Sequence, residues 1–159
     1  MESGNLRYRL ATVADAGEIA QMSRALIERD LEWTWTLPRV ARNIRSRDCS
    51  SVVACDDTAV VGFAIMFFGD EDAHLNLLAV KAEHQRRAIG RRLFEWLRES
   101  ALTAGIAQIH LELRVTNAGA RDFYTALGFT ASGYIPSYYG GRETALRMML
   151  RLRQRAISA

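Results

Sequence analysis

The order of hydrophobic and polar residues along this chain predicts short strands first, and then helices and strands in alternation. Two β-branched and apolar runs, 51–55 and 59–68, are separated by the polar residues 56–58, which is typical of a β-hairpin. A third run, 73–80, begins after an acidic turn. These segments are expected to form three consecutive antiparallel strands, preceded by a first strand near 7–12.

Apolar residues at helical spacing predict one helix before this hairpin and another after the third strand. The first has Asp15 as its expected N-cap. A short basic helix near 40–46 follows Pro38 and an aromatic loop. The later helix begins at Ala88 and ends at Gly105, a residue typical of helix C-caps. The expected apolar stripes are Ile19, Met22, Leu26 and Ile27 in the first helix and Ile89, Leu93, Trp96, Leu97, Ala101 and Ala104 in the later one.

The last third of the chain alternates again between strand and helix. Residues 108–115 have the period of a strand, Asn117 can cap a helix over 118–127, and 129–135 and 143–150 form two final strands. The element order is therefore β-α-α-β-β-β-α-β-α-β-β. This order predicts an α/β (α+β) fold with a mixed central sheet of about seven strands.

Length and composition favour one soluble domain over residues 1–159, with 49% hydrophobic and 25% charged residues. No repeat, low-complexity tract or Pro/Gly-rich linker marks a second domain. The longest run made only of apolar residues and glycine, 59–69, is shorter than the roughly 20 residues that a membrane helix needs. The first residues have no apolar signal core, so we expect a cytoplasmic protein without a membrane partner.

Charge and cysteine content narrow the chemistry only slightly. The net charge is +3, and Lys81 is the one lysine among 21 basic residues, which indicates an anionic ligand only weakly. Cys49 and Cys55 have no metal-ligand spacing with the histidines. We therefore expect reduced, structural cysteines and no metal site.

An arginine-rich segment, HQRRAIGRRL (84–93), joins a strand ending in LLAV to the helix that follows. A helix start presents free backbone N–H groups at the positive end of the helix dipole, and such an end binds phosphate well. Gly90 would let the backbone approach an anion closely. The anion would be held by charge-assisted hydrogen bonds from Arg86, Arg87, Arg91 and Arg92. A solvated basic helix start explains the same residues.

Glu112 and Tyr124 each have a catalytic and a structural interpretation. In the strand IHLEL, the apolar residues share one face and His110 and Glu112 share the other. If this strand is central, its polar face lines a wet cleft and Glu112 is a candidate base; if it is an edge strand, that face meets solvent. Tyr124 can likewise be a helix residue packed on the sheet with its hydroxyl at the rim.

Together these segments resemble the GNAT superfamily of acetyl-CoA-dependent N-acetyltransferases over nearly the whole chain. The family motif Q/R-x-x-G-x-G/A reads QRRAIG here, with Gln85 and Gly90 in register and Ala88 where the family usually has its first glycine. We expect Ala88 to be helical and still to present its N–H. The chain looks closest to the ribosomal-protein alanine N-acetyltransferases, through LLAVKAEHQRRAIGRRL, LELRVTNAGARDFYTALGF and YYGGRETALRMML.

This resemblance implies acetyl-CoA as cosubstrate and assigns a role to each matching residue. Glu112 would be the general base, through a water molecule, and Tyr124 the acid that protonates the leaving thiolate. His110 could share or replace the base. Coenzyme A would be held by Leu78, Ala79, Val80, Arg86, Arg87, Ala88, Ile89, Gly90, Arg91 and Asn117.

The acceptor amine is open between several hypotheses. Tyr138 and Tyr139 resemble the hairpin by which N-terminal acetyltransferases hold a peptide, which favours the α-amine of a protein or peptide. Glu32, Trp33 and Trp35 could instead form an acidic, aromatic pocket for a small cationic amine of polyamine, amino-acid or antibiotic type. A non-enzymatic CoA- or nucleic-acid-binding module is a third hypothesis that would explain the arginines. A homodimer is possible.

Overall fold

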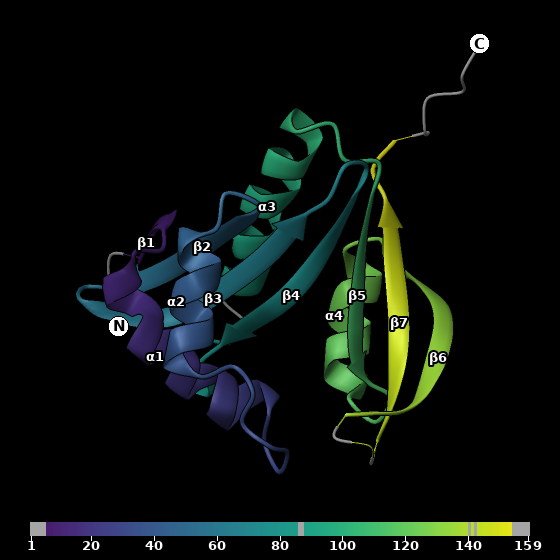
Figure 1. The fold of residues 1–159 in the computed structure, drawn as a ribbon, viewed down its shortest axis with the longest axis horizontal. Coiled ribbons are helices and arrows are strands. Elements are labelled where there is room, and N and C mark those ends of the chain that lie inside the picture. Colours follow the sequence, from purple (N-terminus) through teal and green to yellow (C-terminus); the bar gives the residue numbers. More distant parts are fainter. Residues whose placement is uncertain (1–5, 86–87, 140, 142, 154–159) are drawn as a thin grey trace. The chain divides into compact units, whose positions relative to one another are not determined.

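The computed structural model describes residues 6–85, 88–139, 141 and 143–153. In chain order its main elements are β1 (Leu6–Leu10), α1 (Ala16–Met22), α2 (Leu37–Arg45), β2 (Cys49–Asp56), β3 (Ala59–Phe68), β4 (Asp72–Val80), α3 (Ile89–Thr103), β5 (Gln108–Arg114), α4 (Ala118–Ala126), β6 (Thr130–Tyr139) and β7 (Glu143–Arg151) (Figure 1). This confirms the predicted order. Helix α2 begins before the predicted residue 40 because Pro38 fits the first turn of a helix, where its missing N–H needs no partner.

The strands form a seven-stranded mixed sheet in the order β1-β2-β3-β4-β5-β7-β6. Antiparallel pairs join β1 to β2, β2 to β3, β5 to β7 and β7 to β6, whereas Asp72–His74 of β4 pair in parallel with Gln108–His110 of β5. The chain divides into two compact units. The first unit runs to Phe67 and resumes over Leu75–Ser100; the second consists of Phe68–His74 and the residues from Ala101 on. A single domain over 1–159 stays a prediction.

In the first unit, β2 and β3 are buried on both faces because helices cover both (Figure 1). Helices α1 and α2 pack on one face, in a core that includes Val40 and Phe63. Helix α3 packs on the opposite face at Gly62, where an added Cβ would lie 3.2 Å from both Ile89 Cγ2 and Leu93 Cδ1. Gly62 therefore allows the first turn of α3 to lie directly on β3.

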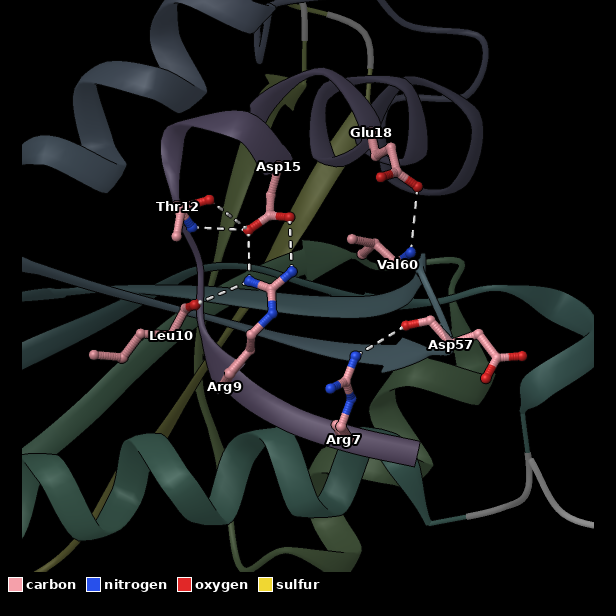
Figure 2. Close-up of polar contacts among 8 residues, drawn as sticks. All are labelled: Arg7, Arg9, Leu10, Thr12, Asp15, Glu18, Asp57 and Val60. Atoms are coloured by element: carbon pink, nitrogen blue, oxygen red, sulfur yellow. Dashed lines mark hydrogen bonds and ion pairs between the residues drawn. The ribbon is translucent and has the colours of Figure 1, made fainter. Parts of the chain in front are cut away.

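The predicted N-cap of α1, Asp15, is bonded to β1 and to the turn before the helix (Figure 2). A 3-10 turn over Val13–Asp15 precedes the helix, and Thr12 occupies its N-cap position. The Asp15 carboxylate accepts hydrogen bonds from the Arg9 guanidinium at 2.8 and 3.0 Å and from the Thr12 N–H at 2.7 Å. Asp15 occupies the N-cap position of α1, as predicted, but its side chain makes no cap hydrogen bond to that helix. The Arg9 guanidinium, opposed by burial, holds the pKa of Asp15 below its ordinary value.

Two further contacts in Figure 2 tie β1 and α1 to the β2–β3 hairpin. The Arg7 guanidinium donates to the carbonyl oxygen of Asp57 at 3.3 Å. The Val60 N–H donates to the Glu18 carboxylate at 3.2 Å. These bonds connect residues far apart in the sequence and hold β1 and α1 to the β2–β3 hairpin.

The apolar stripe predicted for the first helix is interrupted. Helix α1 ends at Met22 and continues as a π-helical turn over Ser23–Ile27. A π-turn adds a residue to the repeat and so rotates the side chains that follow it. Ile19 is therefore fully buried, whereas Leu26 is 38% exposed.

The second unit is built around β5, which has β4 on one side and β7 on the other. β4 pairs with β5 over Gln108–His110 and β7 pairs with it over Gln108–Arg114, so β5 is not an edge strand, as one of the two alternatives required. That its polar face lines a cleft stays a prediction. Ile109, Leu111 and Leu113 are buried on the opposite face. Helix α4 follows, and the Asn117 side chain accepts a hydrogen bond from the Ala120 N–H at 3.0 Å, which confirms the predicted cap.

Among the residues that the structure describes, no helix is long and apolar enough to cross a membrane. Within the same ranges, no three His, Cys, Asp or Glu side chains lie together in a way that could hold a metal ion.

Candidate active site

The predicted phosphate-binding residues lie at the start of α3, in the first unit. The carbonyl oxygen of Ala88 accepts the Arg92 N–H at 3.0 Å, which is the first bond of the helical ladder. The N–H groups of Ile89, Gly90 and Arg91 precede that bond and have no partner within the helix. This first turn can therefore direct three N–H groups at an anion. Arg86 and Arg87 lie outside the residues that the structure describes.

The side chain of Arg92 contacts β1 and does not lie where a phosphate-binding arginine was expected. Its guanidinium carbon lies 4.7 Å from the centre of the Tyr8 ring on β1, the geometry of a cation–π contact. Arg91, its neighbour, is exposed. Among the described arginines at the start of α3, Arg91 is thus the one available to a ligand, whereas Arg92 anchors the helix to β1.

The backbone of Ala88 corrects one expectation. Its φ is +62°, which is left-handed and not helical. Because a Cβ is disfavoured there, this conformation suits the glycine that the family motif usually has at this position. Ala88 therefore stands at the N-cap position of α3, where its carbonyl accepts the first helical bond, and the residue is exposed.

We expect Ala88→Gly to stabilise the folded protein by about 1 kcal/mol, because glycine adopts a left-handed conformation without the steric cost of a Cβ. For a chain of this size, the melting temperature should rise by roughly 2–4 °C. Thermal and urea denaturation would measure both quantities. The matched change Ala126→Gly, at an exposed position in the last turn of α4, should be neutral or destabilising. Equal destabilisation by the two variants would contradict strain at Ala88.

The end of β4 supplies the residues expected to face the pantetheine arm. Leu78 and Val80 are half-buried, and Ala79 is buried between them. The strand is held to β3 by the Lys81 N–H, which donates to the Val61 carbonyl at 2.8 Å. The carbonyl oxygen of Val80 accepts a hydrogen bond from Nε2 of Gln85 at 3.0 Å. Gln85, the first residue of the motif, therefore ties the loop before α3 back to the end of β4.

In the second unit, Glu112 lies at the centre of a network of hydrogen bonds. Its side chain is only 5% exposed. Oε1 lies 2.6 Å from Nε2 of His74, and the Tyr138 hydroxyl donates to the same oxygen at 3.4 Å. Oε2 accepts from Nε of Arg147 at 3.2 Å. Strand pairing explains the last contact, because Glu112 and Arg147 are direct partners between β5 and β7.

The charges around Glu112 keep it ionised. Burial raises the pKa of this carboxyl, but hydrogen bonds and charge from His74 and then Arg147 outweigh it, so that the pKa is lowered overall. A carboxylate held in this way has a fixed orientation and is charged at neutral pH. It can accept a proton transiently, or through a water molecule, although it is a weak base.

Tyr124 projects from α4 and is 8% exposed. Its ring makes edge contacts with Phe123 and Phe129, at centroid distances of 5.0 and 5.4 Å. Burial, followed by the nearby Tyr139, raises the pKa of its hydroxyl well above the ordinary value. The hydroxyl therefore retains its proton at neutral pH and can donate it as a hydrogen bond.

Four residues selected from the sequence are brought together in this unit. Burial, and then the neighbouring Tyr138 and Glu112, raise the pKa of Tyr139 above its ordinary value. Tyr138 and Tyr139 contact each other edge to face, at a centroid distance of 4.9 Å. The Tyr138 hydroxyl also bonds to Glu112, so direct contacts join Glu112, Tyr138 and Tyr139 into a cluster, and Tyr139 contributes to the raised pKa of Tyr124 beside it.

Other predicted residues do not join this cluster through the contacts that the structure describes. His110 Nε2 lies 3.8 Å from the Asp72 carboxylate, and its possible share in the base role stays a prediction. The Asn117 side chain is engaged as the cap of α4. Its predicted contact with coenzyme A is likewise untested.

The residues proposed for a small-amine pocket lie in the first unit. The rings of Trp33 and Trp35 pack against the core, and each has a cation over it from the chain itself, Arg24 at 4.9 Å and Arg39 at 3.9 Å. Glu32 is exposed. The loop is instead organised by Glu28, a buried carboxylate that accepts the backbone N–H groups of residues 34 and 35 at 2.9 and 2.8 Å. These contacts favour packing over a pocket for an external cation.

Sequence reasoning missed His74 and Arg147, the two partners of Glu112. They lie 38 and 35 residues from it in the chain. His74 occupies a polar position in an alternating strand, as does His110, and no local pattern distinguishes the two. In the parallel pairing of β4 with β5, His74 lies opposite His110, which brings it next to the polar face of β5. This register cannot be read from the sequence.

Comparison with known proteins identifies the family of this fold and site. The acetyltransferase (GNAT) family matches residues 20–129. That region is more than half of the chain, and the protein belongs to this family. The resemblance found in the sequence is confirmed.

Individual relatives agree with this assignment. The [ribosomal protein bS18]-alanine N-acetyltransferase of Salmonella typhimurium is 36% identical over 97 residues, which are 59% of this chain and 66% of that protein. The match therefore spans slightly less than two thirds of the relative's length. The crystal structure of the ribosomal-protein-S18-alanine N-acetyltransferase from Escherichia coli has a TM-score of 0.80 and 25% identity, and the match covers 98% of this chain and 99% of that one. Ard1 from Thermoplasma volcanium shares the fold, with a TM-score of 0.82 at 20% identity over 94% and 99% of the two chains.

Proposed function

We propose that this protein transfers an acetyl group from acetyl-CoA to a primary amine, and that the amine is the N-terminal α-amine of a protein or peptide. The observation that carries the proposal is the cluster of Glu112, Tyr124, Tyr138 and Tyr139 in one unit of a GNAT protein. It combines an ionised carboxylate, a protonated hydroxyl and an aromatic pair. The family assignment and the names of the relatives support it.

Glu112 and Tyr124 would act on opposite sides of the reaction. The amine must be neutral to attack the thioester carbonyl, and Glu112 would take the proton it loses, through a water molecule. As the new C–N bond forms and the C–S bond breaks, the Tyr124 hydroxyl would donate to the sulfur that leaves. Because its pKa is raised, Tyr124 keeps its proton until negative charge develops on that sulfur.

The start of α3 fits the anionic part of coenzyme A. Three N–H groups of its first turn lack partners within the helix, and the ladder begins only at the bond from Arg92 to Ala88. Ile89, Gly90 and Arg91 would hold the pyrophosphate, with Ala88 as the turn residue and Arg86 and Arg87 adding charge. Leu78, Ala79 and Val80 would offer backbone groups to the pantetheine arm, and Asn117 would contact the cofactor.

The α-amine is the acceptor that this chemistry suits best. Its ordinary pKa of about 7.7–8.0 leaves a sizeable neutral fraction at physiological pH, whereas a lysine amine, near 10.4, is almost entirely charged. A weakly basic carboxylate such as Glu112 is therefore sufficient to accept the proton of an α-amine. It is poorly matched to the more basic amine of lysine. Tyr138, which is 45% exposed, and Tyr139 would contact the peptide beside that amine.

A panel of acceptors tests the proposal. The protein is incubated with acetyl-CoA and short peptides that have free N-termini, including one that begins with alanine, and thiol release and product mass are followed. We expect acetylation at the N-terminus. The matched control is the same peptide with a blocked N-terminus and an internal lysine, which should remain unmodified.

Spermidine, an aminoglycoside and free amino acids complete the panel. If one of these compounds is acetylated and no peptide is, the acceptor is a small cationic amine and not the α-amine of a peptide. No acetylation of any amine, together with no binding of acetyl-CoA in calorimetry, would refute the transferase function.

A further inference from the structure

The contact between His74 and Glu112 is the shortest in the cluster and has no role in the chemistry above. The two atoms lie 2.6 Å apart. Glu112 is ionised, and a carboxylate only accepts hydrogen bonds, so Nε2 of His74 must carry the proton in this contact. A charge-assisted bond of this length is about twice as strong as a neutral one. Its effect on the carboxylate should be correspondingly large.

The strands that carry these residues make the contact rigid. His74 and His110 are direct partners in the parallel pairing of β4 and β5. Glu112 lies two residues beyond His110 on the same face of β5, so that the His74 side chain reaches it diagonally. Both groups therefore belong to paired strands of the second unit, and the geometry does not depend on a loop.

His74 is also the dominant partner among the three donors to Glu112. Arg147 is 48% exposed and bonds at 3.2 Å. Tyr138 is 45% exposed and bonds at 3.4 Å, near the limit for a hydrogen bond. The His74 side chain is 37% exposed and much closer. Water competes least with the shortest and least exposed contact.

We propose that His74 is a positioning residue for Glu112: its Nε2–H fixes the orientation of the carboxylate and keeps it ionised for proton acceptance. The kinetic part of this inference rests on the proposed acetyl transfer. His74 need not touch either substrate. Without it, Glu112 would be a mostly buried carboxyl with two weaker donors, and burial would favour its neutral form.

The other charged and titratable groups near Glu112 cannot take over this role. Strand β5 carries His110, which faces Asp72, and Arg114, which lies 3.5 Å from Glu143 of β7. Strand β6 contributes Tyr138 and Tyr139, and α4 contributes Tyr124. Arg147, from β7, is the second cation at the carboxylate and remains in every variant below.

A titration of the three histidines by NMR tests the pairing without any substrate. The carbon-bound imidazole protons of His74, His84 and His110 are followed in the wild type and in Glu112→Gln, with assignments from single His→Gln variants. We expect the pKa of His74 to lie above the ordinary 6.5 or so and to fall by about one unit or more in Glu112→Gln. The signals of His84, whose Nε2 lies 3.5 Å from the Asp56 carboxylate, serve as the internal reference. An ordinary pKa of His74 that is unaffected by Glu112→Gln overturns the proposal.

The pH dependence of kcat tests the consequence. In His74→Leu the pKa of Glu112 should rise, so the acid limb of the profile should move at least about one unit towards neutral pH and kcat should fall about tenfold or more. The variant His74→Gln keeps a neutral N–H donor at a similar reach but has no charge. The acid limb of its pH profile should therefore lie between that of His74→Leu and that of the wild type. KM for acetyl-CoA should stay unchanged in both variants.

The outcomes separate the two proposals. Coincident pH profiles in all three forms would overturn the positioning role, even if the NMR pairing is found. If no amine is acetylated, the proposed transferase function is refuted. The NMR titration still decides whether His74 holds Glu112 in its ionised form.

Discussion

The variant Tyr124→Phe should lower kcat by about 10²-fold or more and leave KM for both substrates nearly unchanged. Phenylalanine retains the ring that packs between Phe123 and Phe129, so the fold should survive. The variant lacks only the hydroxyl, whose raised pKa keeps it protonated. A group that acts on charge developing at the leaving sulfur contributes to the transition state and not to substrate binding. Its loss should therefore appear in kcat.

Steady-state kinetics with saturating acetyl-CoA would measure this effect, with circular dichroism and thermal melting to compare the folds. The matched control is Tyr134→Phe, which removes a hydroxyl from a tyrosine that is 59% exposed on β6. It should keep the wild-type rate. An unchanged kcat in Tyr124→Phe would show that this residue is not the acid. Tyr124 would then be a helix residue with a packing role alone.

The variant Gly90→Glu should weaken the binding of acetyl-CoA and of CoA by at least about 100-fold. Gly90 lies in the first turn of α3, where the N–H groups have no partner within the helix. A carboxylate there would lie close to the pyrophosphate, and two unit charges 4 Å apart repel by about 4 kcal/mol near a protein surface. Salt screening reduces this value, and each 1.4 kcal/mol is roughly tenfold in affinity.

This variant should fold well, because glutamate is a better helix former than glycine and its charge suits a helix N-terminus. Calorimetric titration with acetyl-CoA and with CoA would compare it with the wild type. Arg98→Gln changes the net charge by the same amount at an exposed position further along α3 and should bind acetyl-CoA within about threefold of the wild type. Wild-type affinity in Gly90→Glu would place the pyrophosphate elsewhere.

Several features of the fold could be predicted because they depend on local patterns. The alternation of 108–115 predicted β5, and the Asn117 cap and α4 followed from residues adjacent in the chain. Features that the sequence did not predict depend on neighbouring segments and on backbone geometry. Asp15 is the N-cap residue of α1, but its carboxylate bonds to Arg9 and Thr12 and not to the helix, since the β1 strand brings a guanidinium beside it. Ala88 is left-handed because the loop must turn before α3 begins.

The sequence by itself determined the order of elements, the family, and the candidate residues Glu112, Tyr124, Tyr138 and Tyr139, because strand and helix periods and a motif of fixed spacing are all local in the chain. Only the tertiary structure decided what surrounds Glu112. His74 and Arg147 reach it from strands 38 and 35 residues away, at positions set by the register of β4 with β5 and of β5 with β7. Register is a property of strand pairing across the sheet, and one residue of slip would turn each of these side chains to the opposite face.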